Sequence, residues 1–104
     1  MRSIYINDMN TIRRIVAEAI STITKRSLGN CVALTPKRIT DYVGINVQPV
    51  TLTLIKYFLD LMVKHGDARI IERTRSRFYY LCKHSEIWGK DKDYIIDYLN
   101  KLED

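Results

Sequence analysis

No apolar run in this 104-residue chain is long enough to cross a bilayer, because charged residues interrupt the apolar clusters every few positions. The N-terminal segment, residues 1–8, also lacks the long apolar core and the small-residue cleavage site of a signal peptide. Low-complexity tracts, linkers and internal repeats are missing as well. The length suffices for one domain with a single modest core. We therefore expect one intracellular, cytoplasmic domain.

Residues that build metal and catalytic sites are scarce. The two cysteines, Cys31 and Cys82, have no Cys-x-x-Cys spacing, and the two histidines, His65 and His84, are isolated. This pattern indicates neither a zinc site nor an iron–sulfur site. No motif supplies either histidine with a nucleophile or a carboxylate partner. We expect no enzyme activity, no catalytic residue, no metal and no cofactor, and no small-molecule ligand is evident.

Positive charge is plentiful and unevenly distributed. Residues 1–85 contain 14 Lys and Arg against 6 Asp and Glu, whereas residues 86–104 contain 3 against 6. Four arginines fall within nine residues, offset only by Glu72, namely Arg69, Arg73, Arg75 and Arg77. Such charges can simply keep a small surface soluble. Because clustered like charges repel one another, we favour an anionic partner, nucleic acid above all.

Apolar periodicity predicts four helices. The first covers about residues 8–25, with Asn7 or Asp8 as its N-cap and its polar face including Arg13, Arg14, Glu18, Ser21 and Thr22. Thr35-Pro36 predicts the start of the second helix and Gly44 its end, with Ile39, Tyr42 and Val43 buried.

The third predicted helix runs from Pro49 to His65 and is stopped by Gly66. Its expected buried stripe consists of Val50, Leu54, Tyr57, Phe58, Leu61 and Met62. The last helix falls within residues 86–103, although Gly89 weakens its start and favours a beginning nearer Lys90.

Two further segments are predicted to be extended. Residues 31–34 form a short strand, and residues 68–82 form a β-hairpin with the polar tip Arg73-Thr74-Arg75-Ser76. Tyr79 and Tyr80 then point to opposite faces, so that one packs in the core and the other lies outside. A stacking platform for single strands is an open but less favoured use of these aromatic residues.

This order of elements resembles the winged helix-turn-helix family of DNA-binding domains. The resemblance covers about residues 8–82, and it depends on residues 34–45, on residues 50–66 and on the aromatic return strand 77–81. The third helix is longer and more apolar than is usual for a recognition helix. The implied fold is mainly α with a small antiparallel sheet: three core helices, a wing at about 68–82 and an additional C-terminal helix in one domain, residues 1–104.

The resemblance implies a double-stranded DNA-binding protein, a dimeric transcriptional regulator similar to those of archaea or their viruses. Such a regulator would be located at the nucleoid or, if it is viral, in the cytoplasm of the host. The third helix would enter the major groove while the wing contacts the backbone or the minor groove. The candidate DNA-binding residues are Lys37, Arg38, Gln48, Thr51, Thr53, Lys56, Arg73, Arg75 and Arg77. The threonines could instead only cap or solvate the helix, and Lys37 and Arg38 could be plain surface charge.

In the winged-helix topology the short strand pairs with the return strand of the wing, which implies that Cys31 and Cys82 are neighbours. They could form a disulfide, although intracellular disulfides are rare. A homodimer is expected through the C-terminal helix, with the candidate interface residues Trp88, Tyr94, Tyr98 and Leu102. The alternative is that this helix completes the core of the monomer against Ile15 and Ile23.

Two other functions remain open. The chain could be a winged-helix protein–protein interaction module of a replication, transcription or trafficking assembly, docking through Leu52, Ile55 and Leu59 of the third helix. It could also be an architectural protein that binds DNA without sequence preference.

Overall fold

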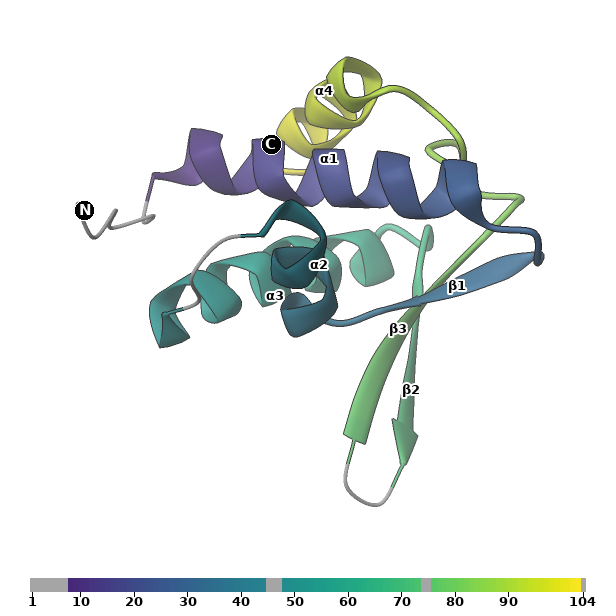
Figure 1. The fold of residues 1–104 in the computed structure, drawn as a ribbon, viewed down its shortest axis with the longest axis horizontal. Coiled ribbons are helices and arrows are strands. Elements are labelled where there is room, and N and C mark those ends of the chain that lie inside the picture. Colours follow the sequence, from purple (N-terminus) through teal and green to yellow (C-terminus); the bar gives the residue numbers. More distant parts are fainter. Residues whose placement is uncertain (1–7, 45–47, 74–75, 104) are drawn as a thin grey trace.

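The computed structural model describes residues 8–44, 48–73 and 76–103 of the chain. The described part is mainly helical, with one small three-stranded antiparallel sheet, as the sequence predicts (Figure 1). Its elements are α1 (Met9–Arg26), β1 (Cys31–Leu34), α2 (Pro36–Val43), α3 (Pro49–Lys64), β2 (Arg69–Arg73), β3 (Ser76–Cys82) and α4 (Lys92–Leu102). Within the described ranges, no helix combines the length and the apolar character that crossing a membrane requires.

Helix α1 is the central support of the fold, and it begins where the sequence predicts. The side chain of Asp8 caps it by accepting a hydrogen bond from the backbone N–H of Asn10. Its apolar stripe is buried, but Ser21, expected on the polar face, is buried as well. The reason is a specific partner: the Ser21 hydroxyl donates to the carbonyl of Lys90, 2.8 Å away, and so fastens α1 to the segment before α4.

Helix α2 starts and ends at the predicted residues. The Thr35 hydroxyl accepts a hydrogen bond from the N–H of Arg38 at 3.1 Å, and Gly44 ends the helix in the left-handed conformation, with φ at 67°. Ile39 is buried as expected. The expectation for Tyr42 is wrong: its ring is exposed, and Thr40 is buried instead.

The buried stripe of α3 differs from the predicted one. The residues that face the core are Thr51, Ile55, Phe58, Leu59 and Met62, whereas Val50 and Tyr57 are 46% and 42% exposed. Leu54 and Leu61 are only partly buried. Since α3 has apolar residues on most of its circumference, periodicity alone selects no single face. Packing against α1 and α2 makes the selection.

The sheet has the strand order β1-β3-β2 and is antiparallel throughout. Val32 and Leu34 of β1 lie opposite Leu81 and Tyr79 of β3, and all four side chains are buried in the core. The prediction that one of the two adjacent tyrosines packs inside is therefore confirmed, with Tyr79 as the core residue. Tyr80 lies on the other side of the sheet, as the alternation of side chains along a strand requires.

Helix α4 begins at Lys92, within the predicted range 86–103 and close to the expected start near Lys90, and packs along α1 (Figure 1). Tyr98 is 6% exposed and Leu102 is also buried within the same chain, so the expectation that these two residues form a dimer interface is wrong. Trp88 is partly buried against the core, and Tyr94 is exposed. The alternative is correct for this helix: its apolar side completes the monomer core.

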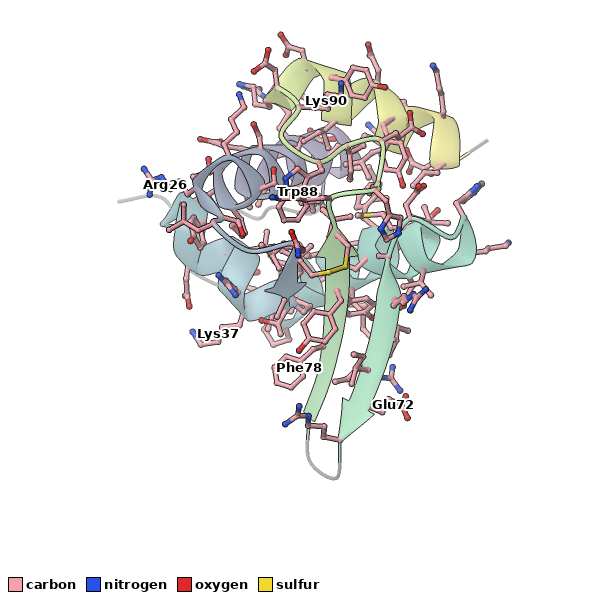
Figure 2. All side chains as sticks on the ribbon, turned by 90° about the vertical axis from the view of Figure 1, so that its right-hand side faces the viewer. Arg26, Lys37, Glu72, Phe78, Trp88 and Lys90 are labelled. Carbon is pink, nitrogen blue, oxygen red and sulfur yellow. A yellow bond between two sulfur atoms is a disulfide. The ribbon has the colours of Figure 1, made fainter. Side chains whose placement is uncertain are left out.

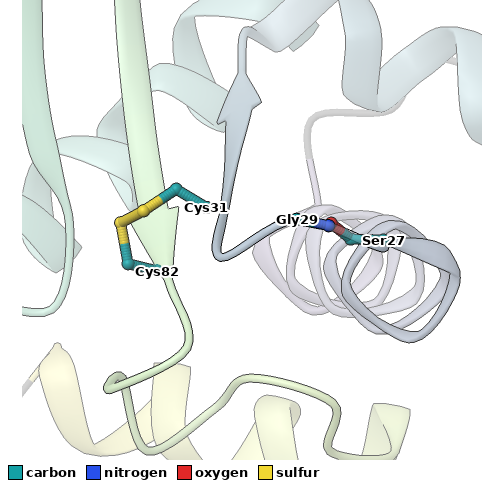
Figure 3. Close-up of a disulfide and its surroundings, with 4 residues drawn as sticks. All are labelled: Ser27, Gly29, Cys31 and Cys82. Atoms are coloured by element: carbon teal, nitrogen blue, oxygen red, sulfur yellow. A yellow bond between two sulfur atoms is a disulfide. The ribbon is translucent and has the colours of Figure 1, made fainter.

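The two cysteines lie directly opposite each other in the register of β1 and β3, as the expected topology implies. The structure joins Cys31 and Cys82 in a disulfide (Figure 3). The two residues are 51 positions apart in the sequence. The covalent loop that they close therefore contains α2, α3 and the whole β2–β3 hairpin.

Candidate nucleic-acid interface

The β2–β3 hairpin projects from the body on the side of α3 that is opposite α1 (Figure 1). A hydrogen bond fixes its base to α3, because the Tyr79 hydroxyl donates to the Asp60 carboxylate over 2.5 Å. Burial opposes ionisation of Asp60, but hydrogen bonds from Tyr79 and Lys56 outweigh it and lower the pKa of Asp60. Burial, together with the Asp60 carboxylate, raises the pKa of Tyr79. The helix and the hairpin are thus connected by a hydrogen bond from the neutral Tyr79 hydroxyl to the ionised Asp60 carboxylate.

The hairpin has two faces, which its register defines. Residues directly opposite each other share a face, so Glu72 and Arg77 lie on the side of Tyr79, toward α3. We call this side, formed by Val32, Leu34, Ile70, Glu72, Arg77, Tyr79 and Leu81, the inner sheet face. The other side, the outer sheet face, consists of Cys31, Ala33, Arg69, Ile71, Arg73, Phe78, Tyr80 and Cys82.

The arginines predicted to contact DNA are therefore divided between the two faces. Arg77 lies on the inner sheet face, where its guanidinium donates to the Glu72 carboxylate at 2.7 Å. Arg73 is exposed on the outer sheet face. Arg75 lies outside the described residues. Only one of these arginines is thus placed beside α3, and it already has an acidic partner.

The polar candidates on α3 are placed differently from one another. Thr51 is 1% exposed and cannot reach a ligand, so this prediction is wrong, because Thr51 occupies the core face expected for Val50. Gln48 is the N-cap residue of α3 and makes no capping hydrogen bond with its side chain. Thr53 is exposed, and its hydroxyl donates to the carbonyl of Pro49. Lys56 is half-exposed and forms an ion pair with Asp60 at 2.9 Å.

The N-terminus of α2 presents two exposed cations. Lys37 extends into solvent (Figure 2) and forms a long ion pair of 3.4 Å with Asp41. An exposed ion pair of this kind contributes little free energy, so Lys37 can readily leave Asp41 for another anion. Arg38 is more fixed, since its guanidinium donates to the carbonyl of Ala33 at 2.8 Å and lies over the ring of Tyr42. Both predicted residues are therefore accessible to an anion.

Charge at the junction of α3 and the hairpin is balanced. Lys56 and Arg77 have the acidic partners Asp60 and Glu72 there. Within the described ranges, three exposed cations on or beside the hairpin have no ion pair, namely Arg69, Arg73 and Lys83. The sequence predictions did not name Lys83 or Phe78 as site residues, and they gave stacking on Tyr79 or Tyr80 only as a less favoured use. The sequence pattern that could have predicted this aromatic side is the alternation of Phe78, Tyr80 and Cys82, because alternate residues of a strand share one face.

Comparisons of this chain with protein-family models, with curated proteins and with solved structures found no match. In the described part of the chain, no group of three or more His, Cys, Asp and Glu residues is placed to hold a metal ion. Function is therefore inferred from the chain's own residues, above all from the cations around α2, α3 and the hairpin.

Proposed function

We propose that this chain is a winged-helix protein that binds double-stranded DNA. Helix α3 enters the major groove with its outward side, and the hairpin lies as a wing beside the adjacent backbone. The single observation that carries the proposal is the hydrogen bond between Tyr79 and Asp60, which keeps the protruding hairpin alongside α3. The residues proposed to contact DNA are Lys37, Arg38, Gln48, Thr53, Arg73 and Arg77.

Charge supports the proposal. The first 85 residues contain 14 Lys and Arg against 6 Asp and Glu, and five of these cations are exposed at the N-terminus of α2 and on the hairpin, namely Lys37, Arg38, Arg69, Arg73 and Arg77. Phosphate contacts of this kind fix the position of a protein on the duplex, while base contacts from Gln48 and Thr53 would select the sequence. The ion pair between Arg77 and Glu72 must open or rearrange when Arg77 binds phosphate. We therefore expect modest affinity.

A role as a homodimeric transcriptional regulator remains part of this proposal. Two copies would match two half-sites on DNA. Because Tyr98 and Leu102 belong to the core of the monomer, an α4 interface would have to use the exposed Tyr94. Sedimentation equilibrium of the free protein and of the protein with duplex measures the oligomeric state directly.

The test is a salt titration of duplex binding. The fluorescence anisotropy of a labelled random-sequence duplex is measured for the wild type, for Lys37→Gln/Arg77→Gln and for the matched control Arg26→Gln/Lys101→Gln. The control removes the same charge from exposed positions on α1 and α4. Each lost phosphate contact should reduce the slope of log Kobs against log salt by about 0.9. We expect a decrease of about 1.8 for the first variant and none for the control.

Two outcomes would refute the proposal. One is the failure of the wild type to bind any duplex at low salt. The other is an equal loss of affinity in the test and control variants, which would mean that net charge rather than this surface attracts DNA. Selection of bound duplexes from a random pool then separates a regulator from an architectural protein without sequence preference.

A second candidate function, a winged-helix protein–protein interaction module, is favoured by one observation. Large apolar side chains of α2 and α3 are exposed, namely Tyr42, Val50 and Tyr57. The docking residues expected from the sequence are largely wrong, because Ile55 and Leu59 are fully buried. Failure of duplex binding at low salt, with the fold intact, would favour this function over the first.

A further inference from the structure

The outer sheet face combines aromatic rings with unpaired cations. Phe78 and Tyr80 are partly buried on it, and Ile71, directly opposite Phe78, is 39% exposed. Phe78 and Glu72 project to opposite sides of the hairpin (Figure 2), as the register requires. In the same view no helix of the described residues crosses in front of the hairpin. These rings therefore lie at the surface, although the core is on the other side of the same strands.

Cations surround these rings. Arg69 lies directly opposite Tyr80, and Arg73 lies on the same face nearer the tip. Both are exposed, and neither forms an ion pair within the described part of the chain. Lys83, also exposed, follows the end of β3. Asp67, two residues before Arg69, accepts a hydrogen bond from the Tyr98 hydroxyl of α4. The face is thus aromatic and positive.

A pocket of about 430 Å³ lies where this face meets the body of the protein. Its lining includes Tyr80, the cations Arg69 and Lys83, His84 and the two disulfide cysteines, together with one acidic residue, Asp67. Its size falls within the range of about 300–1,000 Å³ that is usual for small-ligand sites. One nucleotide could place its base against the Tyr80 ring there while its phosphate meets Arg69 or Lys83.

The spacing of the two rings selects the kind of nucleic acid. Phe78 and Tyr80 are two residues apart on one strand, so their Cα atoms are about 7 Å apart at a rise of about 3.4 Å per residue. Successive nucleotides of a stacked strand rise only about 3.4 Å. Two neighbouring bases can therefore meet the two rings only when the strand is unpaired and extended.

We propose that the outer sheet face is a binding site for single-stranded nucleic acid, with bases stacked on Phe78 and Tyr80 and phosphates bound by Arg69, Arg73 and Lys83. Base–aromatic stacking is tolerant of sequence because every base has a flat face. This site shares only Arg73, which lies on the outer sheet face near the tip, with the proposed duplex surface, and its other residues do not belong to that surface. Either site can exist without the other.

The test measures binding of labelled (dT)10 and (rU)10 at low salt to the wild type and to Phe78→Leu/Tyr80→Leu. Leucine keeps the apolar packing of the hairpin but removes the flat rings. The matched control is Tyr94→Leu, which removes an exposed tyrosine from α4. We expect the double variant to bind about 30-fold more weakly, which corresponds to the loss of about 1 kcal/mol of stacking at each of the two rings. The control should bind as the wild type does, and duplex affinity should change less than twofold.

A charge series and a covalent map complete the test. Arg69→Gln should lower the salt slope of single-strand binding by about 0.7, whereas Arg26→Gln on α1 should not change it. Photo-crosslinking of the unaltered protein to an oligonucleotide containing 5-iodouracil needs no variant to fold. We expect the crosslink at Phe78 or Tyr80.

Several results would overturn this inference. These are no binding of either oligonucleotide at low salt, equal affinity for the leucine variant and the wild type, or a crosslink located on α3 or α4. Poly-glutamate provides a further check, because competition as effective as that of an oligonucleotide of equal charge would show that stacking contributes nothing.

Discussion

Opening the Cys31–Cys82 disulfide should remove a large part of the stability of this domain. The bond closes a loop with a sequence separation of 51 residues. In the chain-entropy description, a loop of this length stabilises the native state by about 4 kcal/mol at 25 °C, because the cross-link restricts the unfolded chain. The total stability of small domains is only about 5–15 kcal/mol. Since Cys31 is exposed, a reductant can reach the bond in the folded protein.

The measurement is urea unfolding followed by the fluorescence of Trp88, which packs partly against the core. Oxidised protein, reduced protein and the variant Cys31→Ser/Cys82→Ser are compared. At a typical slope of about 2 kcal/mol per molar urea, the midpoint should fall by about 2 M on reduction. The serine variant should unfold near the midpoint of the reduced protein, and reductant should leave it unchanged.

The reasoning is refuted if reduction shifts the midpoint by less than about 0.5 M, because loop closure at this separation predicts several times more. It is also refuted if alkylation followed by mass measurement finds two free thiols in protein purified without reductant. The loop contains both helices and the hairpin of the proposed interfaces. At urea concentrations between the two midpoints, reduction should therefore also abolish duplex binding, because only the oxidised protein remains folded there.

Two further predictions concern the body of the fold. Burial, together with the Asp67 carboxylate, raises the pKa of Tyr98 above the ordinary tyrosine value of about 10. The stability that the neutral Tyr98 hydroxyl gives to the folded state is therefore fully present below pH 10 and is lost as the pH rises above that value. Tyr98→Phe should lower the unfolding free energy by about 1.5 kcal/mol at pH 7. Above pH 10, the unfolding free energy of the wild type should fall more steeply than that of the variant, by about 1.4 kcal/mol per pH unit. Gly44→Ala should cost about 1 kcal/mol in urea unfolding, because an alanine at φ 67° is strained even though its methyl group would meet nothing within 4 Å. Gly29→Ala, where φ is not positive, is the control and should not destabilise the protein. Equal destabilisation by the two glycine substitutions would contradict the prediction for Gly44. Equal stability of Tyr98→Phe and the wild type at pH 7 would contradict the prediction for Tyr98.

The sequence by itself determined the order and the limits of most elements. The limits of a helix could be predicted from the sequence where a capping residue or a helix-ending glycine specifies one position. Asp8 and Thr35 cap the starts of helices, and Gly44 ends one. The alternation of side chains along β3 also predicted that only one of Tyr79 and Tyr80 would enter the core. These signals act within a few residues of chain, so they can be interpreted without knowledge of the partners.

Tertiary packing decided which sides of the apolar helices became surface. In α3 nearly every turn carries apolar residues on more than one side, and only contact with α1 and α2 turned Thr51 inward and Val50 outward. Packing of α4 along α1 likewise buried Tyr98, which the sequence alone could equally assign to a dimer interface. The division of Arg73 and Arg77 between two faces depends on the register of β2 with β3. Register and helix rotation are set by long-range contacts, because burial of one side against a partner favours one orientation among several that are locally equivalent.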